Sequence, residues 1–449
     1  MLPNIQTIYE LSEKLRIAVI KTLGLDEKEK VFAGNEEKLF LFVLFENLPD
    51  SDHPTSTKIY DYKNVTNYRM VDIWSGEIAK RKNEIIRHSL SQSIRNLIIA
   101  ARNLILKIKY YAIIQYRLNH NKNLIHFAAH LRYTNYIIPN LTNYFFKNEN
   151  EKDFKLREIF YYNMGEAGID SKLKEYLKYL FPTSHLESYF ELKNHKISGY
   201  QTKTIATSIY GIMEDPLISF LVKKSECKLV YIQHGGGYGL NSNSIKWQIE
   251  KDGSDIMYFW GTGNNNVYPT RYRNKYFPKI KNKLIFILSD KHTQESISFY
   301  TELQEKVINN YGLNSTIVSH PNGPRFKNGN IQYGIGNRQH EQAQLIIFDR
   351  PGNSFLYARI LTKRPFIILE GDYELNPETE NAAKFLYLLR EEGILINRLK
   401  LEDKINYWMN LKPKHSQIMF EKSARKFLRH VLKQPKLIDL LNKGNEFAE

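Results

Sequence analysis

The alternation of short apolar runs with helical segments, from about residue 200 onward, is the feature that most constrains the fold. Runs that predict strands cover residues 204–208, 228–233, 255–260, 283–289, 315–320, 343–349 and 365–369. Helical segments are predicted after Pro216 and over residues 293–310 and 354–361. Strands that alternate with helices form parallel βαβ units with right-handed crossovers. We therefore predict an α/β protein with parallel sheets.

The first 200 residues predict a helix-rich region. Apolar residues recur at helical spacing over 5–23, a long apolar stretch covers 85–110, and a helix over 172–181 stops at Pro182. The apolar run 39–45 is compatible with a strand or with a buried helix, because periodicity does not separate the two. A chain of 449 residues exceeds one ordinary core. We place the domain boundary in the polar stretch 271–281, which predicts an N-terminal lobe of residues 1–271 and a C-terminal lobe of residues 272–449.

Charge and cysteine usage narrow the class of protein. The chain has 64 Lys and Arg against 48 Asp and Glu, a net charge of +16. Such a charge attracts phosphorylated ligands and anionic membranes, although a solvated basic surface explains it equally well. The densest basic regions are 80–82, 107–117 and 412–436, and no nucleic-acid-binding signature accompanies them. We expect no nucleic acid as partner and a peripheral contact with the inner membrane face.

Cys227 is the single cysteine, so an intramolecular disulfide is excluded and a cysteine-based zinc site is not expected. No segment reaches the roughly 18 uncharged apolar residues that a membrane span needs. The N-terminus lacks a basic region followed by an apolar run, so no signal peptide is expected. These features predict a cytoplasmic protein.

The glycine-rich segment Gln233-His-Gly-Gly-Gly-Tyr-Gly239 directly follows a predicted strand. Glycines allow the backbone N–H groups to face an anion, and ligands bind at the carboxyl ends of strands in open α/β sheets. The segment matches neither the dinucleotide fingerprint nor a phosphate-binding loop that ends in Gly-Lys-Ser/Thr. It is similar to an esterase oxyanion loop, but no Gly-x-Ser-x-Gly motif exists in the chain. We expect Gln233, Gly235, Gly236, Gly237 and Tyr238 to contact a substrate; a purely structural turn is the alternative.

Two further segments at strand ends predict a phosphate site. His320 and Pro321 follow the strand 315–320, and Arg325 could add a bidentate contact. Asp349, Gly352, Asn353 and Ser354 lie between the strand 343–349 and a helix, where Asn353 or Ser354 would cap the helix and leave free N–H groups for a phosphate. A loop histidine and an ordinary capped helix are the alternatives. Both segments together predict one crevice for a nucleoside mono- or diphosphate.

For the other candidate sites, a purely structural role is a better explanation than metal binding or catalysis. His126 and His130 have helical i, i+4 spacing but lack the accompanying Glu of a zinc-binding helix. Asp50-Ser-Asp52 lies between Pro49 and Pro54 in a polar loop, far from the βαβ pattern. We therefore expect no metal and no cofactor. Glu166, in the small-residue segment 163–168, is a candidate general base, with a loop acid as the alternative.

The segment 228–239, with Tyr258-Phe-Trp260-Gly261 and the residues from Phe181-Pro182 to Phe190, resembles a family of transferases encoded in bacterial surface-carbohydrate loci. The resemblance covers about residues 140–400. His320-Pro321 and Ser354 are further similar to GT-B glycosyltransferases that use CMP-linked ulosonic or nonulosonic acids. The resemblance implies two Rossmann-like lobes that face a central cleft, with a final helix that crosses back to the first lobe.

It also implies transfer of a sugar from a nucleotide-sugar donor to a glycan or lipid-linked glycan acceptor. The CMP-linked sugar would be of the Kdo, sialic or pseudaminic type, while UDP-, GDP- and dTDP-sugars stay open. An inverting reaction needs a general base, for which His234 and Glu166 are the candidates; a retaining reaction needs neither. A two-lobed nucleotide-sugar epimerase and a non-catalytic nucleotide- or polyanion-binding protein are the other hypotheses.

Overall fold

The computed structural model describes two compact units, each with a sheet and its own helices. The first unit takes its residues from 4–232 and 245–257, and the second from 233–244 and 258–440. The residues described are 4–48, 152–194, 204–207, 228–233, 235–241, 244–269, 281–288, 315–319, 331–333, 342–352, 355–370, 375–437 and 439–440, the backbone of 125–127, and single residues within 219–223 and 298–310. This division differs from a single boundary near residue 271, because the loops after two strands of the first sheet pack with the second unit.

The helices of the first unit begin at side-chain caps that the sequence supplies. Asn4 caps α1 (Ile5–Leu23), which ends at Gly24 in the left-handed conformation. Asp153 caps α7 (Phe154–Glu166) and Asp170 caps α8 (Ser171–Leu180). Helix α7 packs against both α1 and α8. A short 3-10 turn η2 (Thr183–His185) and α9 (Tyr189–Asn194) follow.

The undecided run 39–45 is a helix, α2 (Glu36–Asn47). Gly34 and Asn35 both have positive φ and turn the chain into this helix. Glu36 and Glu37 lie in its first turn, where the helix dipole favours negative charge. The apolar residues 39–44 are all buried, so α2 is surrounded by protein and shows no amphipathic period.

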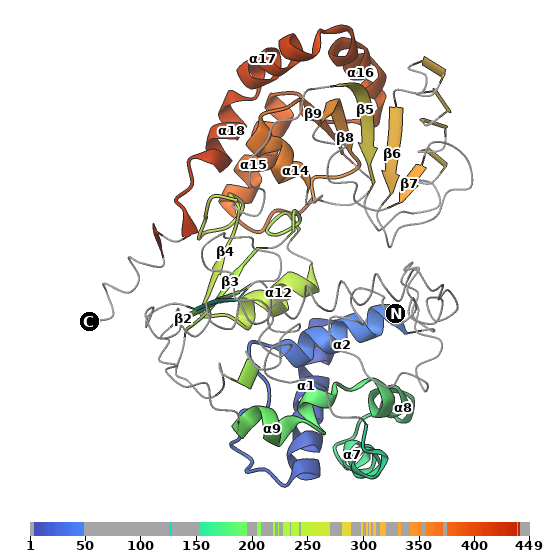
Figure 1. Cartoon of the computed structure of the whole chain (residues 1–449), viewed down its shortest axis with the longest axis vertical. Coiled ribbons are helices and arrows are strands. Elements are labelled where there is room, and N and C mark those ends of the chain that lie inside the picture. Colours follow the sequence, from blue (N-terminus) through green and yellow to red (C-terminus); the bar gives the residue numbers. More distant parts are fainter. Residues whose placement is uncertain are drawn as a thin grey trace, which may run out of the picture. The chain divides into compact units, whose positions relative to one another are not determined.

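The first sheet has four strands in the order β1-β2-β3-β4: Ile125–Phe127, Thr204–Thr207, Lys228–Ile232 and Ile256–Tyr258. β2 pairs in parallel with both β1 and β3. Helix α12 (Ile245–Asp252) packs against α2 (Figure 1). The Tyr231 hydroxyl in β3 donates to the Gly34 carbonyl at 2.7 Å, which holds the turn before α2 against the sheet.

The second sheet has six strands in the order β10-β9-β8-β5-β6-β7. In chain order the strands β5 to β10 are Lys281–Ile287, Ser315–Ser319, Ile331–Tyr333, Ala343–Phe348, Phe366–Leu369 and Leu395–Ile396. All five neighbouring pairs are parallel. This is the Rossmann order 3-2-1-4-5-6, and the order reverses between β5 and β8. Ligands of this fold bind outside the carboxyl ends of the strands at that reversal.

Helices of the second unit pack on this sheet and on one another (Figure 1). They are α14 (Phe355–Thr362), α15 (Glu380–Glu391), η5 (Arg398–Lys400), α16 (Leu401–Asn410), α17 (Pro413–Ser423) and α18 (Arg425–Leu432). α16 packs on β8, where the buried Gln344 amide donates to the Trp408 and Leu411 carbonyls at 2.8 and 2.6 Å. α18 packs on α14 and α15.

The predicted α/β class with parallel sheets and a helix-rich N-terminal region is confirmed. The basic region 412–436 forms two helices, because Ala424 separates α17 from α18. The strands β1, β7 and β10 were not predicted, because two or three residues are too few for a period to show. The stretch 85–110 lies outside the described residues. None of the helices described is long and apolar enough to cross a bilayer.

Candidate active site

The glycine-rich loop begins at a fully buried glutamine, Gln233. Its Nε2 donates to the Gly235 carbonyl, and its Oε1 accepts from the Trp260 N–H at 2.7 Å. Its backbone N–H donates to the Tyr258 carbonyl at 2.9 Å. Gln233 therefore joins the loop after β3 to the loop after β4 and sets the path of the glycines.

The glycine-rich loop lies beside the turn that follows β8. A Cβ placed on Gly352 would be 3.5 Å from the Gly237 Cα, and one placed on Gly237 would be 3.9 Å from the Gly352 Cα. The backbone of Gly237 is exposed, whereas Gly236 is buried. Two segments 115 positions apart thus bring bare backbone together in the second unit, which is the arrangement that lets N–H groups approach an anion.

The turn after β8 lies at the reversal of strand order. Asp349 follows β8 directly, is buried, and its N–H donates to the Ile287 carbonyl at the end of β5. Gly352 precedes α14, whose first residue is Phe355. The carboxyl ends of β5 and β8 and the start of α14 therefore meet where a Rossmann sheet binds its ligand.

The loop after β4 supports this region from the side. Trp260 is fully buried and its ring lies 5.0 Å from that of Tyr357 on α14. The Thr262 hydroxyl donates to the Tyr238 carbonyl at 2.8 Å, and Tyr238 is itself buried. The Thr379 hydroxyl, which caps α15, donates to the Thr262 carbonyl at 2.6 Å. These contacts attach the glycine loop to α14 and α15.

Helix α18 contacts the same loop. The His430 Nε2 lies 2.8 Å from the Gly261 carbonyl, and the Tyr268 N–H donates to the Pro435 carbonyl at 2.8 Å. Burial lowers the pKa of His430, which favours the neutral ring as the donor. The C-terminal helix therefore contacts residues 258–268, which were predicted as part of the N-terminal lobe. That it crosses back to the first unit stays a prediction.

The structure brings Gly237 next to Gly352. The residues of the predicted set that it describes in the second unit are Gln233, Gly235, Gly236, Gly237, Tyr238, Asp349 and Gly352. The other predicted residues of the donor site, together with the candidate base His234, lie outside the described residues: His320, Pro321, Arg325, Asn353 and Ser354.

Glu166 is the last residue of α7, and its predicted place in a loop is wrong. The helix continues to this residue because the Asp153 cap and the apolar Phe160 and Met164 fix it against the core. The carboxylate is 45% exposed, accepts from the Tyr162 hydroxyl at 3.1 Å and lies 3.6 Å from the Lys21 ammonium. Its role as a base stays a prediction.

A buried ionisable cluster in the first unit was missed from the sequence. Glu36 is 1% exposed, and its Oε1 accepts from the Ser219 hydroxyl and from the Ala33 N–H at 3.1 Å. The same oxygen lies 3.6 Å from the His185 Nε2 and 3.7 Å from the Lys223 Nζ. Glu36 is 149, 183 and 187 positions away from His185, Ser219 and Lys223, so only folding brings these residues together.

Burial dominates the titration of this cluster. It raises the pKa of Glu36 to about 7, against the opposing effect of the Lys223 charge. It lowers the pKa of Lys223 to about 8 and the pKa of His185 well below its usual value. His185 is packed among aromatic rings, with the Phe32 ring at 5.4 Å and the Phe220 ring stacked at 6.0 Å. The cluster is a packed part of the core in which several polar groups converge on one oxygen of the Glu36 carboxylate.

Metal-binding groups do not gather in the part of the chain that the structure describes, where no three His, Cys, Asp or Glu side chains converge. Asp50, Asp52, His120 and His130 lie outside that part, as does the side chain of His126.

The strands and helices define an α/β protein whose second sheet has the Rossmann strand order. A model of the LIC12162 family transferases matches residues 6–313, which is more than half of the chain. The chain belongs to this family and is a transferase, as predicted. The match begins well before residue 140, so it includes the N-terminal third that the expected range 140–400 omits. It ends before the turn that contains Gly352.

No curated protein matches the sequence. Solved structures with some similarity include the glycosyltransferase SnogD from Streptomyces nogalater (10% identity, 66% of this chain and 82% of that chain, TM-score 0.32). Another is the spinosyn rhamnosyltransferase SpnG complexed with thymidine diphosphate (10%, 58% and 76%, TM-score 0.32). A third is SsfS6 from Streptomyces sp. SF2575, complexed with thymidine diphosphate (9%, 66% and 80%, TM-score 0.33). TM-scores this low give no correspondence between residues, and the fold class of this chain rests on its own strands and helices.

Proposed function

We propose that this transferase is a metal-independent glycosyltransferase of the two-lobed GT-B type. It would move a sugar from a nucleotide-sugar donor to a glycan or lipid-linked glycan of a surface polysaccharide, such as capsule or lipopolysaccharide. The observation that carries the proposal is the approach of Gly237 to Gly352 at the reversal of strand order in the second sheet. Two glycine backbones at the start of a helix suit a phosphate-bearing leaving group.

The donor lobe is assigned to the C-terminal residues 272–449 and the acceptor lobe to residues 1–271. The donor phosphate would rest on the N–H groups before α14, with Asn353, Ser354, His320 and Arg325 as further contacts. The loop Gly235–Gly237, held in place by Gln233, would contact the donor sugar or its carboxylate. In our proposal a CMP-linked ulosonic or nonulosonic acid is the donor, on the strength of His320-Pro321 and Ser354.

The transfer step needs groups that stabilise the leaving nucleotide and, for inversion, a group that accepts a proton. The acceptor hydroxyl oxygen forms a bond to the anomeric carbon while the bond from that carbon to the phosphate oxygen breaks. The nucleotide leaves with the electron pair, and fixed N–H dipoles and cations stabilise its charge. For inversion, His234 or Glu166 accepts the hydroxyl proton. The enzyme would work in the cytoplasm, in contact with the inner face of the membrane that holds the acceptor.

A thermal-shift panel of CMP, UDP, GDP and dTDP tests the donor assignment. Stabilisation by CMP alone, lost in His320→Ala with the fold intact, supports the proposal. Stabilisation by UDP, with hydrolysis of UDP-GlcNAc, would instead indicate an epimerase. Stabilisation by duplex DNA and by none of the nucleotides would indicate a binding protein and reject the transferase chemistry proposed here.

A further inference from the structure

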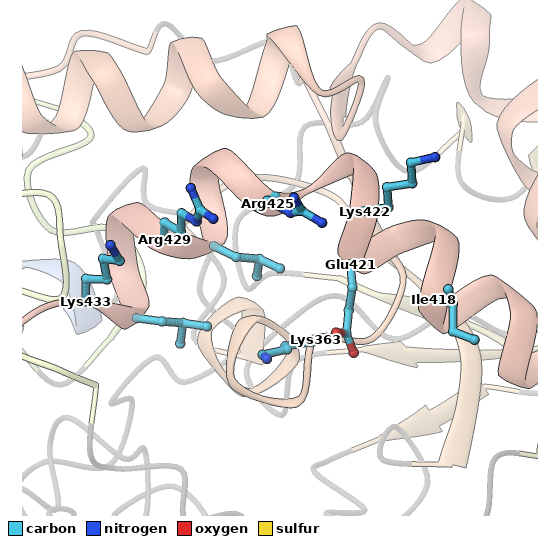
Figure 2. A pocket seen from close by; sticks show the side chains of 9 residues that line it. Lys363, Ile418, Glu421, Lys422, Arg425, Arg429 and Lys433 are labelled. Carbon is cyan, nitrogen blue, oxygen red and sulfur yellow. The ribbon is translucent and has the colours of Figure 1, made fainter.

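A basic groove lies along α17 and α18 in the second unit, with a volume of about 490 Å³. Five cationic side chains line it together with one acid and three apolar side chains (Figure 2). The cations are Lys363, Lys422, Arg425, Arg429 and Lys433; the others are Glu421, Ile418, Leu428 and Leu432. This groove coincides with the densest basic region of the C-terminal sequence, which the transfer chemistry does not use.

Three of the cations share one face of α18, and a fourth continues them from α17. Positions 425, 429 and 433 are four residues apart along α18 and its C-cap, so their side chains follow one stripe, and Lys422 near the end of α17 extends it. At about 1.5 Å per residue the part of the stripe on α18 is roughly 12 Å long. That is longer than one phosphate group and suits a surface that presents several phosphates side by side.

The fifth cation of the lining, Lys363, comes from neither α17 nor α18. Lys363 follows α14 and has a positive φ of 53°, a conformation that glycine adopts without strain and lysine does not. In Figure 2 the Lys363 side chain lies below α18, while the ends of Arg429 and Lys433 point up from it.

These charges are not neutralised within the described residues, where none of the five cationic side chains takes part in an ion pair or a hydrogen bond. Glu421 is the single acid of the lining, and its carboxylate accepts from the Gln417 amide at 3.2 Å. The lining therefore has a net charge of about +4, in a chain that is +16 as a whole.

The lining of the groove suits a membrane surface better than a nucleic acid. Its lining has no aromatic side chain on which a base could stack. Ile418 is 59% exposed at one end of the stripe, where an apolar residue beside cations suits the boundary of lipid headgroups. Phe427 and Val431 point into the core, so α18 would bind without leaving its place.

We propose that the stripe on α17 and α18, with Lys363, binds the phosphate headgroups of an anionic phospholipid membrane. The inference places the membrane contact of the proposed function on these two helices, and it rests on the proposal that the enzyme contacts a membrane. It does not depend on the donor nucleotide or on the transfer chemistry.

Vesicle co-sedimentation of the full chain tests this proposal. The protein should bind phosphatidylcholine vesicles that contain phosphatidylglycerol, not phosphatidylcholine alone, and salt should weaken the binding. Arg425→Glu/Arg429→Glu should weaken it by roughly thirtyfold or more, because each basic residue near the surface contributes about fivefold. Lys155→Glu/Lys172→Glu, which makes the same change of net charge at exposed positions of α7 and α8, should bind as the wild type does.

Equal weakening in both double variants would show that only net charge matters and would overturn the site. Retained vesicle binding in Arg425→Glu/Arg429→Glu would do the same. Arginine-dependent binding of inorganic pyrophosphate or of RNA, without vesicle binding, would replace the membrane by another ligand. The nucleotide thermal shift should be unchanged in both double variants, so a failure of the donor assignment is recognised separately.

Discussion

At the scale of single residues, buried polar side chains hold loops and helix ends in place. Gln233 and Gln344 are both fully buried glutamines of the second unit, each with two hydrogen bonds. Gln233 shapes the glycine loop. Gln344, in β8, donates instead to two carbonyls at the end of α16. The same amide thus holds a loop in one place and a helix end in the other.

This contrast predicts different effects of the same substitution. Gln233→Leu and Gln344→Leu should each lower the free energy of unfolding by about 1–3 kcal/mol, because buried partners lose their hydrogen bonds. Gln233→Leu should also lower kcat/KM for sugar transfer by about 100-fold, the usual effect of a displacement near 1 Å in a site. Gln344→Leu should keep kcat/KM close to the wild-type value. Transfer assays well below the unfolding temperature would contradict the positioning role if both variants behaved alike.

The buried cluster around Glu36 predicts two pH dependences of opposite sign. The folded-state pKa of His185 is depressed, so its contribution is present above pH 6.5 and is lost as the pH falls. The folded-state pKa of Glu36 is raised from 4.5 to about 7, so its contribution is present at low pH and is lost as the pH rises between these values. Each group changes the free energy of unfolding by up to about 1.4 kcal/mol per pH unit.

Denaturant unfolding between pH 5 and 7.5 checks both signs. Relative to the wild type, His185→Phe should gain stability as the pH falls, because the phenylalanine needs no proton and fits among Phe32 and Phe220. Glu36→Gln should lose stability relative to the wild type over the same fall. Parallel curves for all three proteins would mean that neither side chain titrates in the way its burial demands.

At the scale of elements, close backbone approaches decide where the loops lie. Gly239 has a φ of +76°, and a Cβ there would be 2.7 Å from the Thr262 carbonyl oxygen. Gly24 has a φ of +63° at the end of α1 and has nothing within 4 Å of its Cβ position. The first glycine is required by conformation and by space, the second by conformation alone.

Alanine at these two positions separates the two requirements. Gly24→Ala should cost about 1–2 kcal/mol of stability, the strain of a left-handed alanine. Gly239→Ala should cost that amount and about 1–3 kcal/mol more, because the Thr262 backbone has to move. Unfolding curves of the two variants measure the difference. Equal costs would show that the loop after β4 yields freely and does not hold the glycine loop.

At the scale of the whole molecule, the features described above belong to different units. The predicted phosphate contacts that the structure describes all lie in the second unit, while the Glu36 cluster belongs to the core of the first. The basic groove also lies in the second unit. Donor binding and membrane contact would then be functions of one unit.

Hydrogen exchange with and without CMP checks this division. The nucleotide should slow exchange of the amides in residues 235–241 and 349–357, since bound phosphate accepts from N–H groups at the start of α14. Amides of α2 and α7 should exchange at the same rate in both samples. Protection confined to the first unit would place the nucleotide elsewhere and remove the donor assignment.

The amino-acid sequence by itself determined the class of fold and the segments that carry the site. Alternating apolar runs predicted β2 to β6, β8 and β9, and the glycines and caps at their ends marked the loops. These signals are local, because a strand, a helix start or a glycine turn depends on a few neighbouring residues.

Only the tertiary structure decided which of these segments meet. It placed Gly237 beside Gly352, gave the six strands the Rossmann order, and assembled Glu36, His185 and Lys223 in one buried cluster. It also showed that residues 39–45 are helical. The sequence does not decide this, because residues 39–44 are all buried and show no alternation of polar and apolar positions. Such contacts join residues that are far apart in the chain, and the burial that selects them has no signature within any one segment.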